Sequence, residues 1–383
     1  MAVSDVKEYA HLTQAQVEEL GRKFDAIRKE IEDSLGEDDA AYIRKMITLQ
    51  RRLAVAARVT LFASAFPPAW VAGTAMLGVA KILENIEIGH NVMHGQWDWM
   101  NDPEIHSTTW EWDTIQPADQ WRHSHNYIHH TFTNVLGRDT DVGYGILRVT
   151  RDQEWRPAHI GNPVWNLMLA TLFQWGVGLH DLDIEAIRTG RKDMGELRRQ
   201  LKQLGRKVRK QAGKDYVLFP LLTGPFFMTT LTANATANLM RNLWAYLVIF
   251  VDHFPDGVTY FTEEELENET KGEWYLRQIL GSANFRARKL THVMAGYLSY
   301  QVEHHLYPDL PSRRYPQIAK KTKALCEEYK IPYILGGLPG HYWQTFRTIC
   351  KMSAPNGKLW NKDLEPVQPA RADRHDRELV TVA

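Results

Sequence analysis

The sequence predicts an all-α integral membrane protein, with four transmembrane helices in two hairpins and a helical cytoplasmic cap. The chain as a whole is mildly polar, yet its apolar residues gather in two runs. The first run, 53–80, is broken by Pro67 and Pro68, and the second, 216–251, has a polar waist at 232–242. Each run therefore predicts two helices of at most the roughly 20 residues that span a bilayer. A soluble all-α core is the alternative.

The order of the elements supports this topology, because two hairpins return the chain to the side on which it started. A third apolar stretch, 163–179, is expected at the membrane interface, since Trp165 and Trp175 suit that position. The stretch 188–214 then holds eleven Lys and Arg residues, which by the positive-inside rule lie in the cytoplasm. This basic stretch is also compatible with a solvated helix, or with binding of anionic lipid or nucleotide phosphates.

Composition bounds the domains and the class of protein. Residues 1–50 are expected to form a cytoplasmic helical segment without a secretory signal, 51–350 a membrane domain, and 351–383 a charged, disordered tail. The formal net charge of zero indicates no particular class of partner, and binding of nucleic acid is not expected. The two cysteines of the sequence, Cys326 and Cys350, argue against a disulfide framework or a cysteine-based zinc site.

Three histidine clusters carry the chemistry of the sequence. They comprise His90 with His94; His125 with His129 and His130; and His304 with His305, preceded by Gln301. Residues four apart share a helix face and can reach a common ion. A lone pair is as readily a solvated or core pair, but this number of imidazoles exceeds what a core or a surface needs. Imidazole is the commonest neutral metal ligand, so a metal centre is predicted.

The centre is expected where helices leave the membrane. His253 follows the second apolar run as His90 follows the first, and it joins the site; a helix-terminal histidine that interacts with the dipole is the alternative. Eight imidazoles exceed what one tetrahedral zinc can bind, so two ions are predicted. Ligation by nitrogen without thiolate suits iron or zinc, and spacing does not separate them. An iron pair at this place could activate dioxygen and attack acyl chains.

The clusters and the stretches between them, from about 53 to 316, resemble the membrane fatty acid desaturases, whose three histidine boxes have this order and spacing. Trp121 and the stretch 133–145 also look like family features. The stretch 90–112 and the flanks of the second box look more closely like acyl-CoA desaturases of actinobacteria. This resemblance implies Δ9 desaturation of stearoyl-CoA at a bacterial plasma membrane, with the metal site on the cytoplasmic side.

By position, the resemblance implies two iron ions, with ligands His90, His94, His125, His129, His130, His253, His304 and His305. Gln301, His123 and His180 are further candidates, as ligands or as partners of ligands. Asn91 stands where many relatives have Asp, and Gln301 is typical of desaturases that act nearer the carboxyl end, so the double-bond position stays open. The cytochrome b5 signature His-Pro-Gly-Gly does not occur, so electrons are expected from a separate flavin reductase, ferredoxin or cytochrome b5.

The implied reaction uses dioxygen and two electrons to introduce a cis double bond into a long-chain acyl thioester, with acyl-CoA expected and membrane lipid around the protein. A tunnel of fixed depth must select the methylene pair. Trp97, Trp121 and Tyr127 are candidates for its walls, although such aromatics are more often core or interfacial anchors. Candidates for contact with a CoA phosphate are Arg122, Arg138, Arg151 and Arg156.

Other functions stay open on the sequence alone. A di-iron lipid hydroxylase would share the boxes but insert oxygen. A His-zinc membrane hydrolase needs one zinc and fewer ligands, and a metal carrier would line its spans with ligands. About two irons per chain would support the oxygen-dependent functions, whereas one zinc would exclude them.

Overall fold

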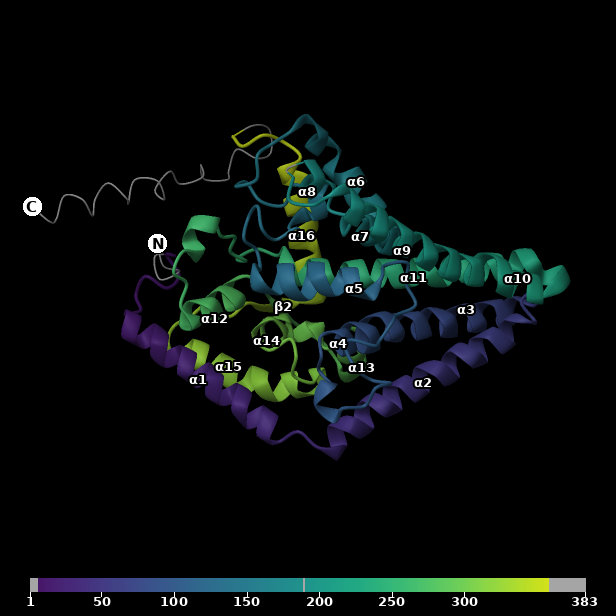
Figure 1. Ribbon diagram of the computed structural model, residues 1–383, viewed down its shortest axis with the longest axis horizontal. Helices are drawn as coiled ribbons and strands as arrows, with labels where there is room; N and C mark the ends of the chain where they lie inside the picture. Colours follow the sequence, from purple (N-terminus) through teal and green to yellow (C-terminus); the bar gives the residue numbers. More distant parts are fainter. Residues whose placement is uncertain (1–5, 189, 358–383) are drawn as a thin grey trace, which may run out of the picture.

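The computed structural model describes residues 6–188 and 190–357, and within them the chain is mainly helical. Figure 1 shows a broad body, with α14 (Gln301–Leu306) near its centre, and an arm that tapers toward α10 (Phe219–Leu222). The helical part of the predicted fold class agrees with this architecture. The third histidine box lies on α14, so the candidate site is in the body.

Helices that run side by side make the arm. α2 (Glu37–Leu61) and α3 (Pro67–Ile82) form one pair. Pro67 and Pro68 occupy the first turn of α3, where backbone N–H groups have no partner within the helix, so proline costs no hydrogen bond there. α9 (Met194–Gly213) runs outward to α10, and α11 (Phe227–His253) returns to the body. α3 packs against both α2 and α11, so it joins the two halves of the arm.

The prediction of four transmembrane helices is wrong. Among residues 6–188 and 190–357, no helix combines the length and the apolar composition that crossing a membrane requires. α3 has 16 residues, fewer than the roughly 20 that span a bilayer, and continues into a π-helical turn that contains Glu84 and Glu87. α11 has 27 residues but carries Arg241 and Asp252. Each apolar run is therefore divided between elements that are too short or too polar.

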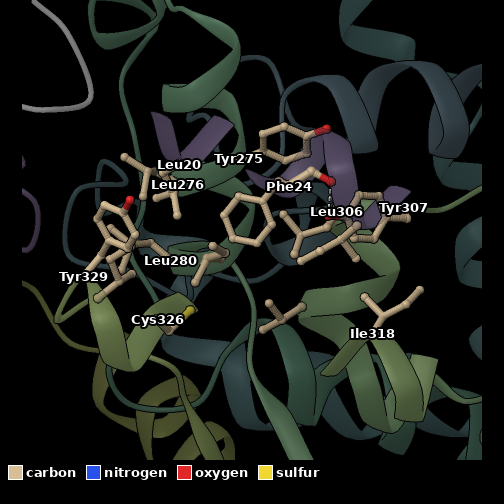
Figure 2. Close-up of a cluster of buried hydrophobic side chains, with 14 of the residues drawn as sticks. Leu20, Phe24, Tyr275, Leu276, Leu280, Leu306, Tyr307, Ile318, Cys326 and Tyr329 are labelled. Atoms are coloured by element: carbon tan, nitrogen blue, oxygen red, sulfur yellow. Dashed lines mark hydrogen bonds between the residues drawn. The ribbon is translucent and has the colours of Figure 1, made fainter. Parts of the chain in front are cut away.

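The body has a hydrophobic core beneath α1 (Gln14–Asp33), shown in Figure 2. Leu20 and Phe24 are four residues apart on the inner face of α1 and pack on α12 (Lys271–Leu280) and α15 (Tyr315–Glu328). Tyr307, directly after α14, donates a hydrogen bond from its hydroxyl to the backbone oxygen of Phe24 at 2.9 Å. This core therefore holds the third histidine box in place.

The remaining α-helices complete the fold. In chain order they are α4 (Asn91–Met93), α5 (Ala118–Trp121), α6 (Asn162–Thr171), α7 (Phe173–His180), α8 (Ile184–Arg188), α13 (Lys289–Met294) and α16 (Leu338–Met352). Two three-residue strands, β1 (Asn284–Arg286) and β2 (Leu335–Gly337), pair in parallel with Asn284 opposite Leu335. The prediction of a disordered tail at 351–383 falls mainly on residues 358–383, which lie outside the described residues.

Candidate metal centre

Each histidine box lies where a regular α-helix is interrupted or ends. His90 is the last residue of a π-helical turn, Leu83–His90, that extends α3. The second box lies on another π-helical turn, Arg122–His129, and His253 is the last residue of α11. π-Helical turns are rare and occur frequently at functional sites. Here they help to bring side chains from four distant segments to one place.

The imidazoles meet in two groups, and within each group one ring nitrogen per histidine lies within 4.8 Å of the others. The first histidine group consists of His90, His94, His125 and His304. The second histidine group consists of His129, His253 and His305. His130 lies between them, with its ring centroid 4.7 Å from that of His94 and 4.6 Å from that of His305. All eight predicted ligands are thus brought together, and their role as iron ligands stays a prediction.

Hydrogen bonds fix the rings of four of these histidines through their Nδ1 atoms. The Nδ1–H groups donate from His90 to Asn91 Oδ1 (3.1 Å), from His129 to Asp139 (3.0 Å), from His304 to the Tyr315 hydroxyl oxygen (3.1 Å) and from His305 to Gln278 Oε1 (3.1 Å). An imidazole that donates from Nδ1 keeps a lone pair on Nε2. The surrounding protein therefore selects the tautomer in which Nε2 can bind a metal ion.

The remaining ring nitrogens supply a test of whether the residues fit a metal. Within the described ranges, hydrogen-bond partners are lacking for Nε2 of His94, His125, His129 and His304, for both nitrogens of His130, and for Nδ1 of His253. A buried polar atom without a partner costs on the order of 1–3 kcal/mol, and a bound cation would offset this. The donor set contains nitrogen without thiolate, which suits iron or zinc. The residues therefore fit a centre of two metal ions.

Burial keeps most of these rings neutral. Burial and the nearby His125 lower the pKa of His90 to about 3, although the hydrogen bond to Asn91 opposes this. Burial and neighbouring imidazoles also hold the pKa values of His94 and His304 well below the usual range. Because neutral imidazole is the form that binds a metal, the first histidine group is ready for an ion at neutral pH.

Two carboxylates that the sequence reasoning missed lie behind the second box. Asp139 accepts the bond from His129, while Asp141 lies 3.5 Å from Nδ1 of His125 and 3.6 Å from Nε2 of His180. Burial lowers the pKa of His129, but the charges of Asp139 and Asp141 outweigh it and raise that pKa above its usual value. A carboxylate behind a ligand histidine orients the ring and makes it a stronger donor. Their place in the stretch that follows the second box was the available signal.

Asn91 explains one departure from the family pattern. Its Oδ1 accepts from Nδ1 of His90 and from Nε2 of Gln96 (3.3 Å), and its Nδ2 donates to the backbone oxygens of Glu87 (2.9 Å) and Gly296 (3.3 Å). An Asp at this position could accept the first two bonds but could not donate the other two. It would also place a negative charge beside the buried Glu87 carboxyl. The amide is therefore the side chain that this environment needs.

Gln301 lies at the second histidine group. Its Nε2 is 2.9 Å from Nε2 of His253 and 3.2 Å from Nε2 of His305, and its Oε1 has no partner in the part of the chain that the structure describes. The two ends of an amide are exchanged by a flip of the side chain, so either end can face these rings. Both predicted roles, metal ligand and anchor of a ligand, are compatible with this position.

The two further histidine candidates lie outside both groups. His123 is exposed and stacks on Tyr127, with ring centroids 5.7 Å apart. His180 ends α7 and contacts the centre indirectly, through Asp141. Burial opposes protonation of His180, but the Asp141 carboxylate outweighs it and raises the pKa. His180 is thus placed to hold Asp141, which in turn lies beside His125.

A cavity opens beside the histidines, and its walls include His90, His125 and His253. α11 lines it with one stripe at helical spacing, namely Asn242, Ala245, Ile249 and His253. The exposed surface of its walls is mainly apolar, which suits an elongated apolar ligand, although polar side chains such as Asn85, Gln116 and Asp181 also line it. The cavity therefore leads along α11 to the metal centre.

The predicted tunnel residues are placed differently from one another. Trp121 lines the cavity, and its ring stacks on His125 at 4.6 Å between centroids. Trp97 is buried in a separate cluster with Ile43 and Val92, and Tyr127 is 57% exposed. The apolar runs and aromatic residues of the sequence do not reveal this difference, because it depends on packing between distant segments.

The four arginines considered for a CoA phosphate also separate. Arg122 lines a surface groove together with Lys207 and Lys210. Arg138 pairs with Glu263 at 2.8 Å, and Arg156 lies 3.5 Å from Glu154. The backbone oxygen of Arg151 accepts from Arg148 at 3.1 Å. Of the four, Arg122 is the one that faces a groove shared with other basic residues.

Tyr144 shapes the cavity from a strained position. It has φ 52°, between Gly143 and Gly145, which also have positive φ. A bulky residue in this left-handed region is a conformational outlier, and such strain gathers at functional sites. The Tyr144 ring lines the cavity and stacks on Phe250 at 5.7 Å. The backbone strain thus fixes one wall beside the histidines.

Comparisons with known proteins agree with the geometry. A family model described as fatty acid desaturase matches residues 65–337. The NADPH-dependent stearoyl-CoA 9-desaturase of Mycobacterium tuberculosis (strain H37Rv) is 50% identical over 378 residues, which cover 98% of this chain and 88% of that protein. The sn-1 linoleoyl-lipid 6-desaturase of Synechocystis is 25% identical over 327 residues, 82% of this chain and 88% of that protein.

These matches confirm the predicted class of activity, an oxidoreductase that desaturates fatty acyl chains, and they do not favour a zinc hydrolase or a hydroxylase. The match spans all three histidine boxes and the whole of α3 and α11. The chain belongs to the fatty acid desaturase family.

Proposed function

We propose that this chain introduces a cis double bond at the ninth carbon of stearoyl-CoA, using dioxygen and two electrons from a separate donor. One observation carries the proposal: two groups of convergent imidazoles, neutral for the most part, border a mainly apolar cavity. Metal ions beside an apolar cavity suit the oxidation of an unactivated methylene chain. The thioester and the bond position are suggested by the M. tuberculosis relative, whose name specifies both.

The chemistry balances without any further reactant. One saturated acyl thioester, one dioxygen, two electrons and two protons give one unsaturated acyl thioester and two waters. When bound at the two histidine groups, a pair of iron ions would supply the redox chemistry that reduces dioxygen and removes two hydrogens from the chain. Side chains such as Asp139 and Tyr315 hold the imidazoles in position, and Trp121 and Tyr144 narrow the cavity and exclude water beside them.

A route for the carrier supports an acyl-CoA substrate. The surface groove contains Arg122, Arg206, Lys207 and Lys210 beside the acidic Glu111 and Asp119. It shares both lysines with a polar pocket, and that pocket shares Trp112 and Thr114 with the apolar cavity. Cationic side chains bind phosphate, and an apolar cavity binds an acyl chain. Phosphates of the carrier at the groove would thus leave the acyl chain directed toward the histidines.

The electron donor and the location form part of the proposal. A flavin reductase, ferredoxin or cytochrome b5 supplies the electrons, and the centre faces the cytoplasm at a bacterial plasma membrane. Exposed apolar side chains at one end of the arm, which include Val59, Phe62 and Phe66, support contact with membrane lipid. Recovery of the protein in the membrane fraction is expected, and release by a salt wash alone would count against this contact.

Product analysis tests the function. The chain is expressed with a reductase in a host that lacks its own desaturase, and new lipids are examined by mass spectrometry. A cis double bond between carbons nine and ten of an eighteen-carbon chain is expected. An alcohol in its place would identify a hydroxylase. Unchanged lipid, with iron bound and electrons consumed, would exclude both.

A further inference from the structure

Gln174 lines the cavity with an amide that has no hydrogen-bond partner among the described residues. Its side chain is 93% buried and lines the apolar cavity, yet neither Oε1 nor Nε2 has a hydrogen-bond partner within residues 6–188 and 190–357. Thr114 lines the same cavity, is also buried, and has an unpartnered Oγ1. Each such group costs on the order of 1–3 kcal/mol if it stays unpaired, so a ligand with matching polar groups is indicated.

These two side chains lie at the end of the cavity away from the histidines. Asn242 donates from Nδ2 to the backbone oxygen of Thr171 at 2.8 Å, which places the start of α7 beside Asn242. Asn242 precedes His253 on α11 by eleven residues, or roughly 16 Å at the helical rise. Thr114 also lines the polar pocket that contains Lys207 and Lys210. The unpaired groups thus lie where the apolar cavity meets the proposed route of the carrier.

Resting on the proposed function, we propose that Gln174 and Thr114 bind the thioester carbonyl and the first amide of an acyl-pantetheine, and that this contact determines which carbons reach the metal centre. Nε2 of Gln174 and the Thr114 hydroxyl donate to the carbonyl oxygen. Oε1 of Gln174 accepts from the pantetheine N–H. Because the rest of the acyl chain is featureless, a fixed carbonyl is what holds it in one register.

These hydrogen bonds would account for the choice of acyl carrier as well as for the position of the double bond. A pantetheine thioester offers a carbonyl acceptor and, two carbons beyond sulfur, an amide donor, which match the two ends of a glutamine amide. A glycerolipid ester offers acceptors only and would leave Oε1 of Gln174 unpaired, which disfavours its binding. A methyl end of the chain at this place would leave all three polar atoms unpaired. CoA and acyl carrier protein share this chemistry, so both enter the test.

The test compares two ligands that differ in one oxygen: stearoyl-CoA and S-octadecyl-CoA, a thioether without the carbonyl. Their dissociation constants are measured on the iron-loaded wild type and on Gln174→Leu, Thr114→Val and Gln317→Leu. Gln317 is exposed and provides the matched control. The wild type and the control should bind the thioester about tenfold more tightly than the thioether. Gln174→Leu should lose most of this preference, and Thr114→Val part of it.

Further readouts separate this inference from simple misfolding and from the function. The melting temperature of Gln174→Leu should be unchanged or higher, because an unpaired buried amide is removed, and its product should contain double bonds at several positions. An intact tenfold preference and a single bond position in Gln174→Leu would overturn the inference. If the preference for the thioester depends on Gln174 but the protein forms no double bond, the proposed function would be refuted and the inference about Gln174 would stand. Binding of stearoyl-acyl carrier protein should depend on Gln174 in the same way as binding of stearoyl-CoA.

Discussion

The body and the arm of the protein each bury a cluster of titratable side chains, and the two clusters are built in opposite ways. In the body, the ring nitrogens of the two histidine groups converge, and six of the eight candidate ligands have at least one ring nitrogen without a hydrogen-bond partner among the described residues. In the arm, a charge cluster joins α2 and α3 to α11 and to the π-helical turn Lys214–Leu218 that follows α9. It consists of Arg58, Lys81, Asp113, Lys214, Asp215 and Arg241.

The charge cluster satisfies its members internally. Asp215 accepts from Lys81 at 2.6 Å and from Arg58 at 2.7 Å, and Lys214 bonds Asp113. Arg241 donates to Asn242 at 3.0 Å. Burial alone would raise the pKa of Asp215, but Lys81 and the other cations hold it far below its usual range. A buried cluster that is complete is structural, whereas one with convergent unpaired donors is a binding site.

Among the substitutions that test this contrast, replacement of a histidine should have the largest effect on activity and iron content. His129→Ala removes one nitrogen from the second histidine group, and complete loss of activity is expected together with a lower iron content, because the remaining donors no longer hold the ion. His123→Ala is the matched control, since His123 is exposed and lies outside both groups. Activity assays and metal analysis check both variants. Equal losses in the two would discredit the ligand assignment.

A substitution in the charge cluster should lower the stability of the protein. Asp215→Asn leaves Lys81 and Arg58 buried beside a neutral amide, and a loss of about 3–5 kcal/mol in the free energy of unfolding is expected. Chemical denaturation measures it. Asp309→Asn, which breaks an exposed pair with Arg28, should cost at most about 1 kcal/mol. Loss of iron from folded Asp215→Asn, at unchanged stability, would contradict the division of roles.

A smaller effect is expected from the carboxylate behind the second box. Asp139→Asn keeps the shape of the side chain but removes the charge that orients and polarises His129. A decrease of about 10- to 100-fold in iron affinity or activity is expected, which a chelator titration followed by assays can measure. Unchanged affinity would show that the hydrogen bond alone, and not the charge, supports His129.

The smallest effect on activity at neutral pH is expected from Glu87→Gln. Burial raises the pKa of Glu87 to about 8, against the opposing bond from Tyr42, because no cation faces it as Lys81 faces Asp215. The folded protein then keeps a proton that the unfolded chain releases above its ordinary pKa of 4.5. Stability should fall as pH rises from about 4.5 to about 8 and then level off. Melting curves should lose this fall in Glu87→Gln, and a stability that instead rises over this window would contradict it.

The comparison also shows what the sequence could predict. The histidine boxes and His253 were found from spacing and position, because ligands must come in sets and helix geometry limits which residues share a face. The carboxylates Asp139 and Asp141 and the amide of Gln174 were missed, since their role appears only when segments far apart in the chain meet. The same holds for Trp97, which packs in a separate core.

The membrane-spanning prediction failed for a related reason. A run of apolar residues is recognised from the order of residues alone, without regard to tertiary contacts. The charged side chains of the arm have partners on other helical segments: Lys81, for example, bonds Asp215, which lies 134 residues later in the chain. α3 and α11 pair through polar contacts, such as that of Trp70 with Thr232 at 3.3 Å, as well as apolar ones. Helix type was predictable from local pattern, whereas the length and environment of each helix depended on tertiary contacts.

Metal analysis of the protein, purified from cells grown with iron, is the sharpest test of a two-metal centre at the histidine groups. The two histidine groups predict about two iron ions per chain, bound in the wild type and largely lost in His129→Ala. One zinc ion per chain, or no metal above the level found in His129→Ala, would refute a di-iron centre at these histidines.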